Sequence, residues 1–140
     1  GFDSFEGLPE DWLDVNGNLV GNVAKKGFFN LKGFLPVIKD VFLYKGWFKD
    51  TLPIYLNVAK PISLLHIDCD LYSSTIEVLN GLNDYILKDT IIVFDEWIYD
   101  NNPKNNNHEQ KAFYEWVNEF NIKYEFIETN YIEQKIVKIL

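Results

Sequence analysis

The sequence predicts an α/β domain whose sheet is mostly parallel and ends in an antiparallel strand pair. In the second half of the chain, apolar runs of strand length alternate with helical patterns, which is typical of a parallel sheet. Only a few residues separate the last two strand-like segments, too few for a parallel crossover. With 140 residues the chain can build one core, so we expect residues 1–140 to form a single domain.

Short elements and long loops are predicted for the first half of the chain. In chain order they are the end of a strand at 1–3, a loop at 4–22, a short helix within 22–39, a strand at 41–45 and a helix at 52–59. Gly, Pro, Asn and Asp dominate the loop, and Pro36 ends the short helix. Pro53 falls in the first turn of the helix at 52–59, and Pro61 lies beyond its end.

Longer and more regular elements are predicted for the second half. They are a strand at 63–68, a helix at 73–88, a strand at 90–94, a polar loop at 100–107, a helix at 108–120 and strands at 123–128 and 134–140. The run SLLHID is almost continuously apolar, which favours a strand covered on both faces. Ser73 or Ser74 is a good N-cap for the helix that follows.

The composition is acidic, with 21 Asp and Glu against 13 Lys and Arg and a formal net charge of −8. Nucleic acid and anionic membranes are therefore not expected as partners, because phosphate binding needs clustered Lys and Arg. Cys69 is the single cysteine, so no intramolecular disulfide forms, and a reducing, cytoplasmic compartment is expected. We find no signal peptide and no apolar run of membrane-spanning length.

Carboxylates follow three of the predicted strands: Asp3, then Asp68 with Asp70, then Asp95 with Glu96. Ligands of α/β sheets bind beyond the carboxyl ends of the strands. If the second and third of these strands are neighbours, Asp68, Asp95 and Glu96 converge. Such a cluster raises its own pKa values and suits a hard divalent cation such as Mg²⁺. The alternative is that these acids only cap the helices that follow.

Other chemically active side chains have a structural interpretation beside a functional one. His66, inside an apolar strand, is more often a core residue than a ligand. Glu109 can favour the helix N-terminus, while the alternative is that His108 contacts substrate. Cys69 points away from Asp68 and Asp70, which argues against a nucleophile. No glycine-rich phosphate loop of either common pattern is present.

Several motifs together resemble one family. FDSFEGLPEDW, KGWFKDTLP, LLHIDCDLYSST, TIIVFDEW and HEQKAFYEW look like the class I S-adenosylmethionine-dependent methyltransferases of the macrocin O-methyltransferase (TylF) type. The resemblance covers nearly the whole chain and implies a Rossmann-like sheet. It also implies that the family's first strand and glycine-rich cofactor loop precede Gly1. The chain opens on a strand end and contains no Met, which agrees with a truncation.

Roles for individual residues follow from the resemblance. It implies that Asp3 binds the cofactor ribose and that Gly46, Trp47 and Phe48 lie against the adenine. The divalent-metal ligands would be Asp68, Asp95 and Glu96. Asp70 resembles the general base. Without the resemblance, Trp47 and Phe48 either pack in the core or flank a flat ring.

The expected function is therefore S-adenosylmethionine-dependent, divalent-metal-assisted O-methylation of a hydroxyl on a sugar or related small molecule. The chain could also form a homodimer. One alternative is a truncated, non-catalytic domain with a scaffold or dimerisation role, and another is a metal-dependent hydrolase. Because the cofactor loop is expected upstream of Gly1, we expect the 140-residue chain alone to be inactive.

Overall fold

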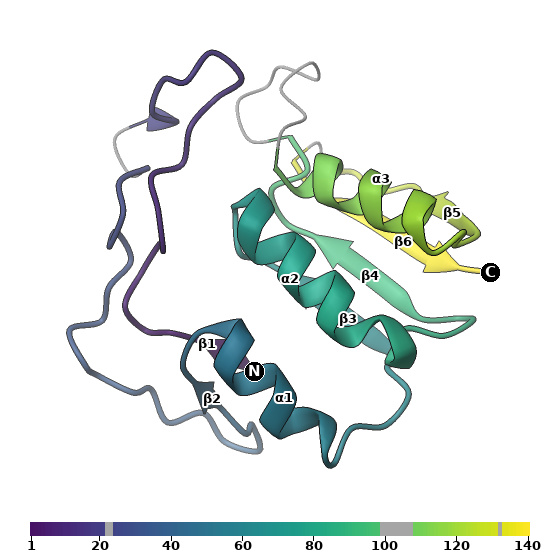
Figure 1. Cartoon of the computed structure of the whole chain (residues 1–140), viewed down its shortest axis with the longest axis horizontal. Coiled ribbons are helices and arrows are strands. Elements are labelled where there is room, and N and C mark those ends of the chain that lie inside the picture. The colour runs from purple at the N-terminus through teal and green to yellow at the C-terminus, as the bar shows by residue number, and fades with distance from the viewer. Residues whose placement is uncertain (22–23, 99–107, 132) are drawn as a thin grey trace. The chain divides into compact units, whose positions relative to one another are not determined.

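The computed structural model describes residues 1–21, 24–98, 108–131 and 133–140. The chain divides into two compact units, Gly1–Val58 and Ala59–Leu140 (Figure 1). The prediction of a single domain over 1–140 stays a prediction. Among the described residues, no helix combines the length and apolar character needed to cross a bilayer.

The unit Gly1–Val58 contains a small parallel strand pair and one helix. Strand β1 (Phe2–Asp3) pairs in parallel with β2 (Tyr44–Lys45), with Asp3 opposite Lys45. The rings of Phe2 and Tyr44 stack at 4.9 Å, which fixes this register. Helix α1 (Phe48–Leu56) follows β2. The predicted strand end before residue 4 is therefore confirmed.

Three predictions for this unit are wrong. No helix forms within described residues 24–43, because Gly27, Phe29 and Lys32 all have positive φ, which a right-handed helix cannot accommodate. The strand expected at 41–45 is limited to its last two residues. The helix expected at 52–59 begins four residues earlier, so Pro53 lies inside it and not in its first turn.

The unit Ala59–Leu140 is built on a four-stranded sheet with the order β3-β4-β6-β5. Strand β3 (Leu64–Ile67) runs parallel to β4 (Ile91–Phe94). Strand β6 (Lys135–Ile139) is antiparallel to β4 and to β5 (Tyr124–Ile127). Both the parallel pair and the antiparallel end of the predicted sheet are confirmed.

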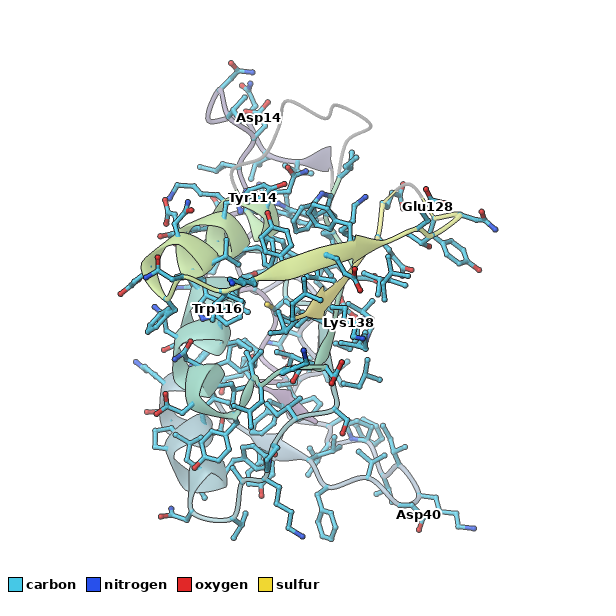
Figure 2. All side chains as sticks on the ribbon, turned by 90° about the vertical axis from the view of Figure 1, so that its right-hand side faces the viewer. Asp14, Asp40, Tyr114, Trp116, Glu128 and Lys138 are labelled. Carbon is cyan, nitrogen blue, oxygen red and sulfur yellow. The ribbon has the colours of Figure 1, made fainter. Side chains whose placement is uncertain are left out.

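Two helices cover one face of this sheet. Helix α2 (Tyr72–Leu82), extended by the 3₁₀ turn η2 (Asn83–Tyr85), and helix α3 (Glu109–Glu119) lie on the same side of the strands, as the two perpendicular views show (Figures 1 and 2). An aromatic core lies between the helices and the strands. Its ring contacts involve Phe94, Trp97, Phe113, Trp116, Tyr124 and Phe126.

Two predictions for this unit are corrected. The described residues of this unit do not cover both faces of strand β3, because Leu64 and His66, which share one face of the strand, are both exposed. Ser73 and Ser74 do not cap α2, since the helix begins at Tyr72 with Leu71 at the N-cap and no capping side chain. The Tyr72 N–H instead donates to His108 Nδ1. The polar loop predicted at 100–107 lies outside the described residues.

Candidate active site

The register of β3 and β4 brings two acidic segments to one edge of the sheet. Ile67 lies opposite Phe94, and the Asp95 N–H donates to the Ile67 carbonyl at 3.0 Å. Asp68 and Asp95 therefore follow their strands at matching positions, at the edge where α/β sheets bind ligands. The predicted neighbourhood of the two strands is confirmed.

Three carboxylates converge beyond these strand ends. One ligand oxygen from each of Asp68, Asp70 and Glu96 lies within 4.8 Å of the others. The backbone of Asp70 has φ +60°, a left-handed conformation that Asp tolerates better than most residues. This sharp turn after the strand accompanies the approach of the Asp70 carboxylate to its two neighbours.

Crowding perturbs the protonation of this group. Burial, followed by the charges of Asp68 and Asp95, raises the pKa of Asp70 to about 6. Burial also dominates at Glu96 and, with the charges of Asp70, Asp68 and Asp95, raises its pKa to about 9. Half-buried like charges cannot all stay ionised without compensation. The cluster therefore holds protons at neutral pH unless a cation replaces them.

The cluster fits a divalent cation in donor type and in size. Oxygen ligands about 2.1 Å from Mg²⁺, or about 2.4 Å from Ca²⁺, lie at most about 4.2 or 4.8 Å apart across the ion. Glu96 Oε2 is buried and has no hydrogen-bond partner among the described residues. A buried carboxylate oxygen without a donor is costly, and a bound cation would satisfy it. The donor set and the orphaned oxygen thus agree with the predicted metal site.

Asp95, predicted as the third ligand, lies outside this group of three. Its Oδ1 is 3.5 Å from His66 Nε2 and accepts a short hydrogen bond from Gln134 Nε2. The side chain of His66 is 52% exposed, so the core position expected for it is wrong. A ligand role for Asp95 stays a prediction, and no pattern in the sequence indicates its contact with Gln134.

The start of α3 contributes three buried polar residues to the same region. His108 Nδ1 accepts the Tyr72 N–H at 3.1 Å, and Glu109 Oε2 accepts the Glu96 N–H at 3.1 Å. The amide Nε2 of Gln110 donates to a backbone carbonyl of the segment after β4 at 2.6 Å. The predicted contact of His108 with substrate stays a prediction, but its Nδ1 is engaged by backbone.

A signal for Glu109 was present in the sequence. It lies on the same helix stripe as Ala112, Phe113 and Trp116, at spacings of three, four and seven residues, and all four are buried. Burial, followed by the charge of Glu96, raises the pKa of Glu109 well above its usual range. A carboxyl on an apolar stripe indicates a buried acid and not merely a residue favoured by the helix N-terminus.

The residues expected to bind the cofactor lie in the unit Gly1–Val58. The Gly46 N–H donates to the Asp3 carbonyl at 3.0 Å, so the two residues are adjacent at the carboxyl ends of β1 and β2. Gly46 has φ +142°, and a Cβ there would lie 3.0 Å from Thr51 Cγ2. Trp47 is the N-cap of α1, and Phe48 is its first residue. The structure thus brings the four residues to one corner of this unit.

Cys69 is unsuited to nucleophilic chemistry. Its Sγ lies 3.5 Å from Thr75 Oγ1, and burial raises the pKa of the thiol well above its usual value. The thiolate, which is the reactive form, is therefore disfavoured. This agrees with the sequence-based expectation against a nucleophile.

An α/β fold with carboxylates beyond the carboxyl ends of parallel strands defines the class, a Rossmann-like domain. Comparison with family models then identifies the family. The model of the macrocin O-methyltransferase (TylF) family matches residues 2–128. The chain belongs to this family, as its motifs predicted.

Solved structures agree with this assignment. A crystal structure of CalS11, a calicheamicin methyltransferase, is 25% identical, with a TM-score of 0.74 over 99% of this chain and 58% of that chain. The apo structure of CalS11, described as a TDP-rhamnose 3′-O-methyltransferase, gives 26% identity and a TM-score of 0.53 over 69% of this chain and 40% of that one.

The O-methyltransferase NovP shares the fold, with 23% identity and a TM-score of 0.63 over 98% of this chain and 57% of that chain. The chain thus spans somewhat more than half the length of the first of these structures. A comparison with curated proteins finds no significant match.

Proposed function

We propose that this chain forms part of an S-adenosylmethionine-dependent O-methyltransferase that acts on a sugar hydroxyl with the help of a divalent cation. The observation that carries the proposal is the convergence of Asp68, Asp70 and Glu96 in a chain of the macrocin O-methyltransferase family. A metal-dependent hydrolase would share the acids but not the family.

Two carboxylates are proposed to hold the cation. Asp68 and Glu96 would be its ligands, and Mg²⁺ is the first choice because it prefers oxygen donors. Asp95, beside Glu96 in the chain, is retained as a third ligand. When bound, the cation supplies positive charge that lowers the pKa of an acceptor hydroxyl, and S-adenosylmethionine supplies the methyl group.

Asp70 is proposed as the general base. Its carboxylate is only half-buried and lies beside Asp68 and Glu96, where the acceptor hydroxyl would bind. A pKa of about 6 leaves most of this carboxyl ionised above neutral pH, so it can accept the hydroxyl proton. The acceptor oxygen then attacks the sulfonium methyl in line, and the protein contributes mainly by positioning.

The cofactor is proposed to contact the unit Gly1–Val58. The exposed carboxylate of Asp3 can accept both O–H bonds of the ribose diol. Gly46, Trp47 and Phe48 would lie against the adenine. The hydrogen bond from the Gly46 N–H to the Asp3 carbonyl supports this, because it puts the expected adenine contact beside the expected ribose contact.

The acceptor is proposed to be a small sugar, free or nucleotide-linked, because CalS11 is described as a TDP-rhamnose 3′-O-methyltransferase. Contact of His108 with this acceptor and a homodimeric assembly remain part of the proposal. So does a cytoplasmic location, which rests on the single cysteine.

Binding of Mn²⁺ tests the metal site, because its free ion is quantified directly by electron paramagnetic resonance. We expect Asp68→Asn and Glu96→Gln each to weaken Mn²⁺ binding by about 10- to 100-fold, since each removes a charged ligand. Asp84→Asn is the matched control, because Asp84 is an exposed acid of the same unit outside the cluster.

A second arm uses the longer enzyme of which this chain is proposed to form part, and measures its transfer of labelled methyl from S-adenosylmethionine to a panel of nucleotide-linked sugars. Transfer that requires Mg²⁺ and is lost in Asp70→Asn would support the proposal. Transfer that survives both EDTA and Asp70→Asn would contradict the metal and base roles. Mn²⁺ binding without any binding of S-adenosylmethionine would favour the non-catalytic alternative for this chain.

A further inference from the structure

We propose that Glu109 is a positioning residue for the metal site. Through the backbone of Glu96, and together with Gln110, it holds the Glu96 carboxylate where a divalent cation can bind. This inference rests on the proposed metal site, but it concerns a residue outside the ligand group.

The position of Glu109 needs an explanation in its own right. The residue is 1% exposed, and a buried carboxyl is costly compared with an apolar side chain of similar size. Among the described residues, its side chain accepts one hydrogen bond, at Oε2 from the Glu96 N–H. Glu109 Oε1 has no partner among the described residues, so packing alone does not account for this residue.

The hydrogen bond from Glu109 holds the backbone of Glu96, whose Oε2 is buried without a partner among the described residues. Glu109 Oε2 holds the backbone N–H of Glu96, and Gln110 Nε2 holds the carbonyl of Trp97, the next residue. Two consecutive helix residues therefore hold the backbone at Glu96 and at the residue after it. With both groups held, the Glu96 carboxylate has fewer orientations to lose when it binds a cation.

The same helix start reaches the other acidic segment. His108 Nδ1 accepts the Tyr72 N–H, two residues beyond Asp70. Helix α3 is itself anchored by Phe113 and Trp116, which are both fully buried. One rigid element thus ties the segments that supply Asp70 and Glu96, which is how ligand groups are kept at a constant separation.

Glu109 acts through Glu96 and not as a ligand. It is not a member of the group whose oxygens lie within 4.8 Å of one another. The metal site therefore needs a hydrogen-bond acceptor for the Glu96 N–H at position 109. A glutamine retains that acceptor in its amide oxygen, whereas a leucine leaves the Glu96 N–H buried and unpaired.

Mn²⁺ titration of three variants of the full chain tests this. Glu109→Leu is expected to weaken Mn²⁺ binding by about 10- to 100-fold, the range seen when partners of metal ligands are lost. Glu109→Gln is expected to bind Mn²⁺ nearly as tightly as the wild type. Val117→Ala is the matched control, because Val117 is buried in the same helix and makes no contact with the acids in the hydrogen bonds described.

A second readout separates positioning from stability. Melting temperatures are measured with and without Mg²⁺. Val117→Ala should lower the melting temperature but keep the full rise on adding Mg²⁺, whereas Glu109→Leu should lose most of that rise. Wild-type affinity in Glu109→Leu, or equal losses in Glu109→Leu and Glu109→Gln, would overturn the positioning role. No Mn²⁺ binding by the wild type would overturn the metal site and the positioning role together.

Discussion

The two units of the chain are each stabilised by different internal interactions. In Ala59–Leu140, helices α2 and α3 and the sheet enclose an aromatic core, and Phe94, Phe113 and Trp116 are fully buried. In Gly1–Val58, backbone hydrogen bonds and turns with positive φ dominate. Some large apolar side chains there are buried, such as Trp12, but others stay in water, as Val37 and Phe42 do at 97% and 87% exposure.

This difference bears on the two groups of proposed functional residues, one in each unit. The acids are supplied by the ends of two paired strands, and one of them is also held from a helix. Asp3 ends one two-residue strand, and Gly46 directly follows the other. A metal site needs ligand positions fixed to a fraction of an ångström, which regular elements provide better than loops. The comparison therefore predicts opposite sensitivities to core and backbone changes.

The largest effect is expected in the aromatic core. Phe113→Ala should lower the free energy of unfolding by about 3–5 kcal/mol, because it leaves a cavity among rings that contact it at 4.8–5.6 Å. Phe42→Ala, the matched change in the other unit, should alter it by less than about 0.5 kcal/mol. Urea denaturation followed by circular dichroism measures both. Equal losses for the two variants would show that the contrast between the units is wrong.

In Gly1–Val58, a substitution that strains the backbone should lower stability more than the loss of an exposed aromatic ring. A Cβ on Gly7 would lie 2.0 Å from the Phe28 carbonyl oxygen, whereas a Cβ on Gly17 would meet nothing within 4 Å. Both residues have positive φ, so only the clash distinguishes them. Gly7→Ala should destabilise the unit by about 1–3 kcal/mol more than Gly17→Ala. Limited proteolysis within residues 1–58 measures this, and equal cleavage rates would contradict it.

The elements of Ala59–Leu140 were predicted from the sequence better than those of Gly1–Val58, because a buried core leaves an apolar period in the sequence. The strands of Ala59–Leu140 and helix α3 have clear apolar periods, and their pairing follows from chain order and connection length. The helix expected within 22–39 failed because several residues there adopt positive φ, which apolar spacing does not reveal. The start of α2 was displaced because a distant residue, His108, binds the Tyr72 N–H in place of a local serine cap.

The sequence was enough to predict which acidic residues lie at the candidate site, but not which of their side chains come together. Strand ends and motifs indicated Asp68, Asp70, Asp95 and Glu96. Side-chain direction depends on the turn at Asp70 and on the contacts of Asp95 with His66 and Gln134, and no period in the sequence encodes these. Glu109 was visible as an acid on an apolar stripe, yet its partner, the Glu96 N–H, depends on tertiary packing.

The smallest effect is a pH dependence that should belong to the acid cluster. The folded pKa of Glu96 is about 9, above its ordinary value, so the folded chain binds more protons than the unfolded chain between about pH 5 and 9. Without divalent cations, the free energy of unfolding should therefore fall as pH rises through this window. Because Glu96 is partly solvated, we expect a loss of only about 1 kcal/mol, or about 4 °C in melting temperature.

Thermal melts at pH 6 and 8, with and without Mg²⁺, measure this dependence. Mg²⁺ binds the ionised carboxylates, so it should raise the melting temperature more at pH 8 than at pH 6. Glu96→Gln should remove most of the pH-dependent loss and of the Mg²⁺ effect, whereas Asp84→Asn, an exposed acid, should keep both. A pH-dependent loss that persists in Glu96→Gln would assign it to another acid whose pKa is raised, such as Asp70 or Glu109, and would contradict the role given to Glu96.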